Sequence, residues 1–283
     1  MRQRVRPYHL VIGFGVFWAL FAIGSGVAPL LAEWFDDSPV QREVFLNIPG
    51  PWRLAFYTLL PVLFVYGSVM FADRVKNWER GAPDRRTTDA KTLPKRLGDF
   101  RAGVYMQTLL RDPAAGLMHS LIYFSFLILF AVTVVSQIQD QVPEGWKFLH
   151  GQTYQAYSFV GDAAGLVFVL GIGWALARRY LQRPYRIRIK SKPEHLLILG
   201  VFFVLGVTGF LAEAFRIAFL GRPDFEKWSF IGYPLSWVFR NTEHLHGWYQ
   251  ATWLVHVATF FVFLIILPIT MIRHMFTSPL NMY

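Results

Sequence analysis

Long apolar runs separated by short polar segments organise this chain of 283 residues. A helix needs about 20 apolar residues to cross the hydrocarbon core of a bilayer. The runs are continuous rather than alternating, which indicates helices and not a β-barrel. The first run is too long for a cleaved signal peptide. We therefore expect an all-α integral membrane protein, a bundle of six transmembrane helices. The predicted spans are residues 8–32, 52–72, 115–137, 154–177, 195–220 and 248–272.

Basic residues fall on alternate sides of these spans. Of the 28 Lys and Arg residues, 21 lie in one set of connecting segments and 5 in the other set. Because Lys and Arg collect in cytoplasmic loops, we expect a multi-pass protein of the inner (cytoplasmic) membrane with both termini in the cytoplasm. The basic set comprises residues 1–7, 74–113, 178–193 and Arg273, and the opposite loops carry acids that include Asp140, Asp224 and Glu226.

Composition agrees with a membrane protein and excludes several other classes. The chain is 54% hydrophobic and 16% charged, whereas soluble domains are about 45–50% apolar and about 25% charged. Cysteine is absent, so these residues form no disulfide, thiolate zinc site or iron–sulfur cluster. The net charge of +10 is interpreted as basic cytoplasmic loops rather than as a nucleic-acid surface.

Two histidines near the end of the chain suggest a redox centre. His256 and His274 are 18 residues apart in the last apolar segment. In one continuous helix this spacing is five whole turns and about 27 Å, so both side chains would share a face. That arrangement suits two haems stacked across a bilayer, because neutral imidazole is an iron ligand. Coincidental spacing is the alternative, and His9 and His195 are interpreted as interfacial residues at helix ends.

A haem with two histidine ligands needs a second histidine from another helix. His119 lies one turn inside the third predicted span, at the level of His274, so these two residues are the predicted pair for a haem near the cytoplasm. For His256, expected near the outer face, the candidates are His150 and His246. His150 is preferred, because His246 belongs to the same helix as His256 or to its lead-in.

Three ionisable residues, Asp162, Glu213 and Arg216, lie within apolar spans. Such groups are costly in a membrane and are usually paired. One interpretation is an ion pair between Asp162 and Arg216 that joins the fourth and fifth spans. The other is functional: Arg216 would neutralise a haem propionate, and Glu213 or Asp162 would act as the catalytic carboxylate that carries protons to a quinone.

Four segments resemble known electron-transfer proteins: LMHSLIYFSFLILF around His119, FLHGQTYQAYSFVGDAAGL around His150 and Asp162, VTGFLAEAFRIA around Glu213, and IRHMFTSPLN around His274. Through them, residues 113–283 resemble the membrane domain of heterodisulfide-reductase-related oxidoreductases, including the electron-transfer flavoprotein:menaquinone oxidoreductase type. The last predicted span also resembles that of the gamma subunit of respiratory nitrate reductase, a dihaem cytochrome b in which two ligand histidines likewise lie 18 residues apart with a proline between them.

This resemblance implies a gamma-subunit-like fold that binds haem b and belongs to a quinone-linked oxidoreductase. The implied organisation is two helices in residues 1–73, a basic cytoplasmic loop at 74–113 and a four-helix haem-binding membrane domain at 114–283. The loop is interpreted as a solvated connector or as a docking surface for a partner. Electrons would pass between a cytoplasmic iron–sulfur or flavoprotein partner, such as electron-transfer flavoprotein, and the menaquinone pool.

The sequence departs from these families at two points. Leu129 stands where the nitrate reductase subunit has a second ligand histidine, so an outer haem takes another ligand or is absent, and the chain holds one or two haems. The related oxidoreductases continue past TSPLN into an iron–sulfur domain. We expect that domain in a longer form of this chain or, alternatively, in a separate subunit.

Two other functions compete with the cytochrome interpretation: a haem-free membrane anchor of a redox complex, and a six-helix transporter. The sequence shows no internal repeat of the kind that many transporters carry.

Overall fold

The computed structural model describes residues 43–82, 89–105, 107 and 109–282, together with five isolated positions before residue 43. Over these residues the fold is helical and contains no strand. The helices are α2 (Gly50–Glu79), α3 (Leu93–Val104), α4 (Pro113–Gln141), α5 (Gly151–Leu176), α6 (Tyr185–Arg188), α7 (Pro193–Phe219), α8 (Gly232–Val238), α9 (Leu245–Ile266) and α10 (His274–Met282).

Five of the described helices are long and apolar enough to cross a membrane: α2, α4, α5 with its extension to Gln182, α7 and α9. They confirm five of the six predicted spans. Most of these helices begin and end within a few residues of the predicted limits. The predicted span at 8–32 lies outside the described residues apart from the isolated positions, so the count of six stays a prediction. After Leu176, α5 continues as a π-helical turn over Ala177–Gln182.

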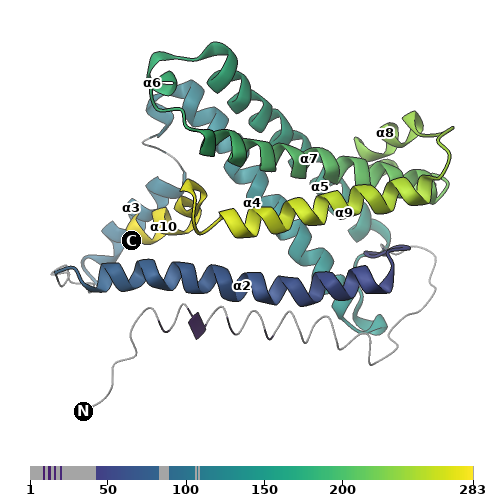
Figure 1. Ribbon diagram of the computed structural model, residues 1–283, viewed down its shortest axis with the longest axis horizontal. Coiled ribbons are helices and arrows are strands. Elements are labelled where there is room, and N and C mark those ends of the chain that lie inside the picture. The colour runs from purple at the N-terminus through teal and green to yellow at the C-terminus, as the bar shows by residue number, and fades with distance from the viewer. Residues whose placement is uncertain are drawn as a thin grey trace.

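The long helices form a bundle in which α7 packs against α5 and α9, α4 against α5, and α2 against α9. Figure 1 shows α3 and α10 together at one end of this bundle and α8 at the other end. We call these the α10 end and the α8 end. Part of the 74–113 loop is therefore folded structure, because α3 packs against α10.

Aromatic rings fill the centre of the bundle. Phe126 of α4, Phe168 of α5, Phe202 of α7 and Phe263 of α9 meet with ring centroids 5.6–6.3 Å apart. Beside them α5 and α7 approach closely at Gly206, where an added Cβ would lie 2.6 Å from a side-chain atom of Val169. Small residues at such contacts allow dispersion forces to hold helices together inside lipid.

The last apolar segment is interrupted, which corrects one expectation. α9 ends at Ile266, and a turn and a short 3₁₀ helix (Met271–Arg273) precede α10. Pro268 explains the break, because proline lacks an N–H and its ring would clash with the carbonyl four residues earlier. The Ile266 carbonyl accepts from the Thr270 N–H at 3.0 Å and from Thr270 Oγ1 at 2.8 Å, and Glu194 of α7 accepts from the Met271 N–H at 2.5 Å. The prediction that His256 and His274 share one face of a continuous helix is therefore wrong.

The basic loops predict which end faces the cytoplasm. α3 and the segment between α5 and α7 lie towards the α10 end, whereas the loops that contain Glu144 and Asp224 connect helices at the α8 end. Alkaline phosphatase fused after Glu144 or Asp224 should be active, as expected outside the cytoplasm. The same reporter after Gly81 should be inactive, and the reverse pattern would contradict the orientation.

Candidate functional site

The structure brings His119 and His274 together at the α10 end. His119 lies in the second turn of α4, and His274 is the first residue of α10. Their ring centroids are 6.0 Å apart and their planes are inclined by 59°. Since α9 ends before His274, this proximity depends on the break around Pro268. The two residues predicted as a ligand pair thus lie side by side, while their role as ligands stays a prediction.

Hydrogen bonding leaves both imidazoles available to a metal. His274 Nδ1 lies 2.7 Å from the Met271 carbonyl. A carbonyl only accepts, so in the neutral ring Nδ1 carries the proton and Nε2 keeps its lone pair. His119 Nδ1 is buried and has no hydrogen-bond partner among the described residues. Buried polar atoms are nearly always paired, so this unpaired nitrogen is a further indication that His119 interacts with a bound group.

The geometry of this pair fits a metal held between two imidazoles. Two imidazoles bound to one metal through bonds of about 2 Å have ring centres roughly 6 Å apart, and this pair has that separation. No group of three or more His, Asp or Glu side chains forms a metal site within the described part of the chain.

His256 occupies a different level from the one expected. It lies eleven residues into α9, about 16 Å from the start of that helix, and therefore near mid-membrane rather than at the outer face. Its Nδ1 is 2.9 Å from Thr208 Oγ1 of α7. Thr208 donates its own proton to the Val204 carbonyl at 2.6 Å, so it accepts from His256. This arrangement again leaves Nε2 unprotonated.

The structure does not bring the proposed partners of His256 to it. His150 is exposed and directly precedes the first residue of α5. His246 lies near the start of α9, where its ring contacts Gln250 at 2.9 Å and the Asn47 carbonyl at 3.3 Å. The ligation of a second haem by His256 and His150 therefore stays a prediction without geometric support.

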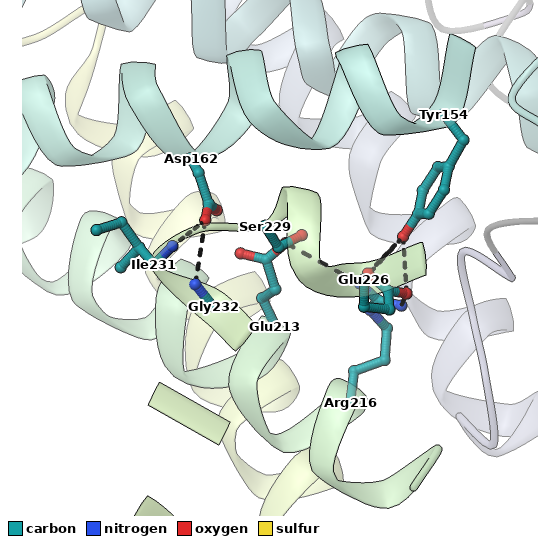
Figure 2. A network of polar contacts seen from close by, with 8 residues as sticks. All are labelled: Tyr154, Asp162, Glu213, Arg216, Glu226, Ser229, Ile231 and Gly232. Atoms are coloured by element: carbon teal, nitrogen blue, oxygen red, sulfur yellow. Dashed lines mark hydrogen bonds and ion pairs between the residues drawn. The ribbon is translucent and has the colours of Figure 1, made fainter. Parts of the chain in front are cut away.

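A buried polar network lies towards the α8 end (Figure 2). Arg216 of α7 binds both carboxylate oxygens of Glu226 at 2.5 and 3.1 Å, and the Tyr154 hydroxyl of α5 lies 2.9 and 3.0 Å from the same oxygens. Arg216 is 6% exposed and Glu226 is 1% exposed. The expected ion pair between Asp162 and Arg216 is thus wrong, because the anion that neutralises Arg216 comes from the loop after α7.

The other two carboxylates of this region also have partners. Asp162 accepts hydrogen bonds from the backbone N–H groups of Ile231 and Gly232 at 2.6 and 3.1 Å, so it caps the start of α8 (Figure 2). Glu213 accepts from Ser229 at 3.0 Å and lies 4.0 Å from Arg216. An added Cβ at Gly232 would lie 2.7 Å from the Glu213 carboxyl group, so a larger residue there would have to displace that side chain. Proton transfer by Glu213 or Asp162 stays a prediction.

Two acids that contribute to polar networks were not singled out, because they look like ordinary loop acids. Glu226 and Asp140 were assigned to the outer loops, but Glu226 is buried and Asp140 belongs to the last turn of α4. An arginine in an apolar span does predict an anion nearby. The sequence offered Asp162 in the neighbouring span, however, and no local pattern distinguishes a loop acid that folds back into the bundle.

Two known proteins are similar to this chain. "EtfAB:quinone oxidoreductase" of Syntrophomonas wolfei subsp. wolfei is 26% identical over 260 residues, which cover 87% of this chain and 35% of that protein. "Probable iron-sulfur-binding oxidoreductase FadF" of Bacillus subtilis is 22% identical over 180 residues, which cover 62% of this chain and 24% of that protein. The chain thus spans about a third and about a quarter of the length of these relatives. No protein-family model matches, and no solved structure matches.

The names of both relatives describe oxidoreductases, one acting with a quinone and one binding iron–sulfur. This agreement supports the expected relationship to quinone-linked oxidoreductases of the electron-transfer flavoprotein type. The likeness to the nitrate reductase gamma subunit stays a prediction.

Proposed function

We propose that this chain is the membrane cytochrome b part of a quinone-linked oxidoreductase. The observation that carries the proposal is the His119–His274 pair, two imidazoles 6.0 Å apart at the α10 end of an apolar bundle. The similarity to a quinone oxidoreductase and to an iron–sulfur-binding oxidoreductase agrees with it. A haem b between these histidines would supply one-electron transfer, the chemistry that the protein side chains lack.

The residues around the pair have distinct roles in this proposal. The Met271 carbonyl holds the His274 ring in the tautomer that a metal needs. Asp112 caps α4 by accepting from the Ala115 N–H at 3.2 Å, and it also pairs with Arg178 at the end of α5 at 3.4 Å. These contacts connect the helix that carries His119 to its neighbour and so keep the ligand in place.

The partner is proposed to approach the α10 end, where α3, α10 and the basic segment between α5 and α7 form the cytoplasmic face. Residues 178–192 contain seven Lys and Arg residues and no acid. An iron–sulfur or flavoprotein partner, such as electron-transfer flavoprotein, would exchange electrons at this face, and menaquinone would exchange them within the membrane. Arg216 as a propionate partner belongs only to the predicted second haem of His256, since Arg216 lies at the α8 end and is paired with Glu226. Glu213 as a proton carrier is part of the same proposal.

An absorption spectrum of the purified protein tests the haem. We expect α- and β-bands of b-type haem after reduction with dithionite, and we expect acidified acetone to extract the haem, because the chain has no cysteine for thioether attachment. A folded, monodisperse preparation without these bands, even after expression with added haem precursor, would contradict the proposal and favour a haem-free membrane anchor.

A further inference from the structure

A second polar cluster lies between α2 and α4, near the α8 end. The Tyr57 hydroxyl of α2 donates to Asp140 Oδ2 at 3.2 Å. It accepts from the side-chain amides of Gln137 and Gln141, each at 2.8 Å. Gln141 also donates to Asp140 at 2.9 Å. We call Tyr57, Gln137, Asp140 and Gln141 the Tyr57 cluster. Polar side chains on membrane-spanning helices are costly to bury, and membrane proteins usually retain them at functional sites.

Two atoms beside this cluster have unused hydrogen-bonding capacity. Gln141 Oε1 and Arg53 Nε are buried and have no hydrogen-bond partner within the residues that the structure describes. Arg53 lies one helical turn before Tyr57 on α2, and its charge acts on the Asp140 carboxylate together with that of Lys147. The cluster therefore offers one buried acceptor and one buried donor that the protein itself leaves unpaired, which points to a ligand with polar groups.

Aromatic rings flank the Tyr57 cluster. The Phe56 and Phe45 rings lie 5.2 and 5.9 Å from the Tyr57 ring. Phe45 in turn contacts Trp253 at 6.1 Å, and Trp253 precedes His256 by one turn of α9. Flat aromatic walls next to hydrogen-bond donors suit a planar ring that carries carbonyl groups.

The surroundings of the cluster face lipid. Leu54, one turn before Tyr57, is 59% exposed, and Ile138, between the two glutamines, is 43% exposed. Exposed leucine and isoleucine on membrane-spanning helices contact acyl chains, so a ligand would enter from the bilayer. A lipid-soluble molecule with a polar head is thereby favoured over a water-soluble one.

We propose that the Tyr57 cluster binds the head group of a quinone, a proposal that rests on the quinone-linked function above. The unpaired Arg53 Nε–H would donate to an oxygen of the head group, and the unpaired Gln141 Oε1 would accept from a hydroxyl of the quinol form. The apolar tail extends into lipid past Leu54 and Ile138.

The chemistry of quinone reduction gives Asp140 a role at this site. Reduction to the quinol consumes two electrons and two protons. In the proposed function the electrons come from the reduced cytoplasmic iron–sulfur or flavoprotein partner. Asp140 lies in the last turn of α4, next to the loop at the α8 end, and its carboxylate contacts the Tyr57 hydroxyl. It is therefore placed to carry protons from the outer surface to the quinone oxygen.

Binding of a fluorescent hydroxyquinoline N-oxide, a quinone analogue, to the purified full chain tests the site. We expect Tyr57→Phe and Gln141→Leu each to raise the Kd about tenfold. Tyr57→Phe removes the hydroxyl that holds Gln137, Asp140 and Gln141 together, and Gln141→Leu removes the unpaired acceptor. Tyr66→Phe is the matched control on the same helix: the Tyr66 hydroxyl bonds the Ile265 carbonyl, away from the cluster, at 3.4 Å. Its Kd should stay within twofold of the wild type.

Unchanged affinity in both Tyr57→Phe and Gln141→Leu would overturn the proposal and place the quinone elsewhere, as would equal weakening in Tyr66→Phe. The haem spectrum of the same samples reports on the proposed function separately. Loss of analogue binding with an intact haem spectrum supports the site. A wild-type protein that shows the haem spectrum but does not bind the analogue overturns the site and leaves the cytochrome function standing.

Discussion

Replacement of His119 or His274 by alanine is expected to remove the b-type haem signal that arises at the α10 end. Each substitution deletes one of two imidazoles that lie 6.0 Å apart, and the structure provides no third histidine beside them among the described residues. His246→Ala is the matched control, because His246 is exposed near the start of α9 and should leave the spectrum unchanged. The measurement is haem per polypeptide by pyridine haemochrome assay, together with the reduced-minus-oxidised spectrum.

The same assay decides how many haems are present. If His256 ligates a second haem, His256→Ala should lower the haem content from two to one, and His119→Ala should leave the signal of that second haem. A content of one that His256→Ala does not change would show that the second haem is absent. Full haem content in both His119→Ala and His274→Ala would contradict the assignment of the ligand pair.

Replacement of Glu226 by alanine is expected to destabilise the protein by about 3–5 kcal/mol, because it leaves a buried arginine without its anion. Arg216 and Glu226 are 6% and 1% exposed, and the Tyr154 hydroxyl would lose its acceptor as well. Thermal unfolding in detergent, followed by tryptophan fluorescence, measures the change. The double variant Arg216→Met with Glu226→Leu should recover much of the loss, since apolar residues of similar size can replace a buried ion pair.

Asp224→Ala provides the control for Glu226→Ala. Asp224 lies in the same short 3₁₀ helix as Glu226 and forms an ion pair with Lys227, but both side chains are largely exposed, at 87% and 56%. Exposed pairs contribute little to stability, so this variant should unfold at nearly the wild-type temperature. If Glu226→Ala and Asp224→Ala lowered the unfolding temperature equally, the buried pair of Arg216 and Glu226 would stabilise the protein no more than an exposed pair does.

Hydropathy predicted the spanning helices well, because a membrane-spanning helix needs about 20 apolar residues in a row. This requirement can be read from one segment without knowledge of its neighbours. α4 and α7 begin and end within about four residues of the predicted spans 115–137 and 195–220. Pro268 was visible within the last span, but composition did not show that the helix would stop there. The break depends on tertiary contacts, such as the one between Glu194 and the Met271 N–H.

The histidine pair and the carboxylate network differ in how far the sequence predicted them. His119 and His274 were identified as a pair from their matching depth in the predicted spans and from the family resemblance. Neither argument requires His256 and His274 to lie on one continuous helix. The partners of Asp162 and Arg216 could not be identified in this way. Asp162 binds two backbone N–H groups at the start of α8, and every residue type except proline has such a group, so the sequence does not mark them. Glu226 reaches Arg216 only because the loop after α7 folds back into the bundle.

The break after α9 also has a consequence for biosynthesis. His119 is incorporated 155 residues before His274, which at ribosomal rates is roughly 10–30 s earlier. α4 can therefore enter the membrane with its histidine long before the second imidazole exists. Since His274 is oriented by the turn around Pro268 and by the packing of α10 on α3, the pair is completed only when this segment folds back against the bundle. Assembly order, rather than helix insertion alone, determines when the proposed haem site is complete.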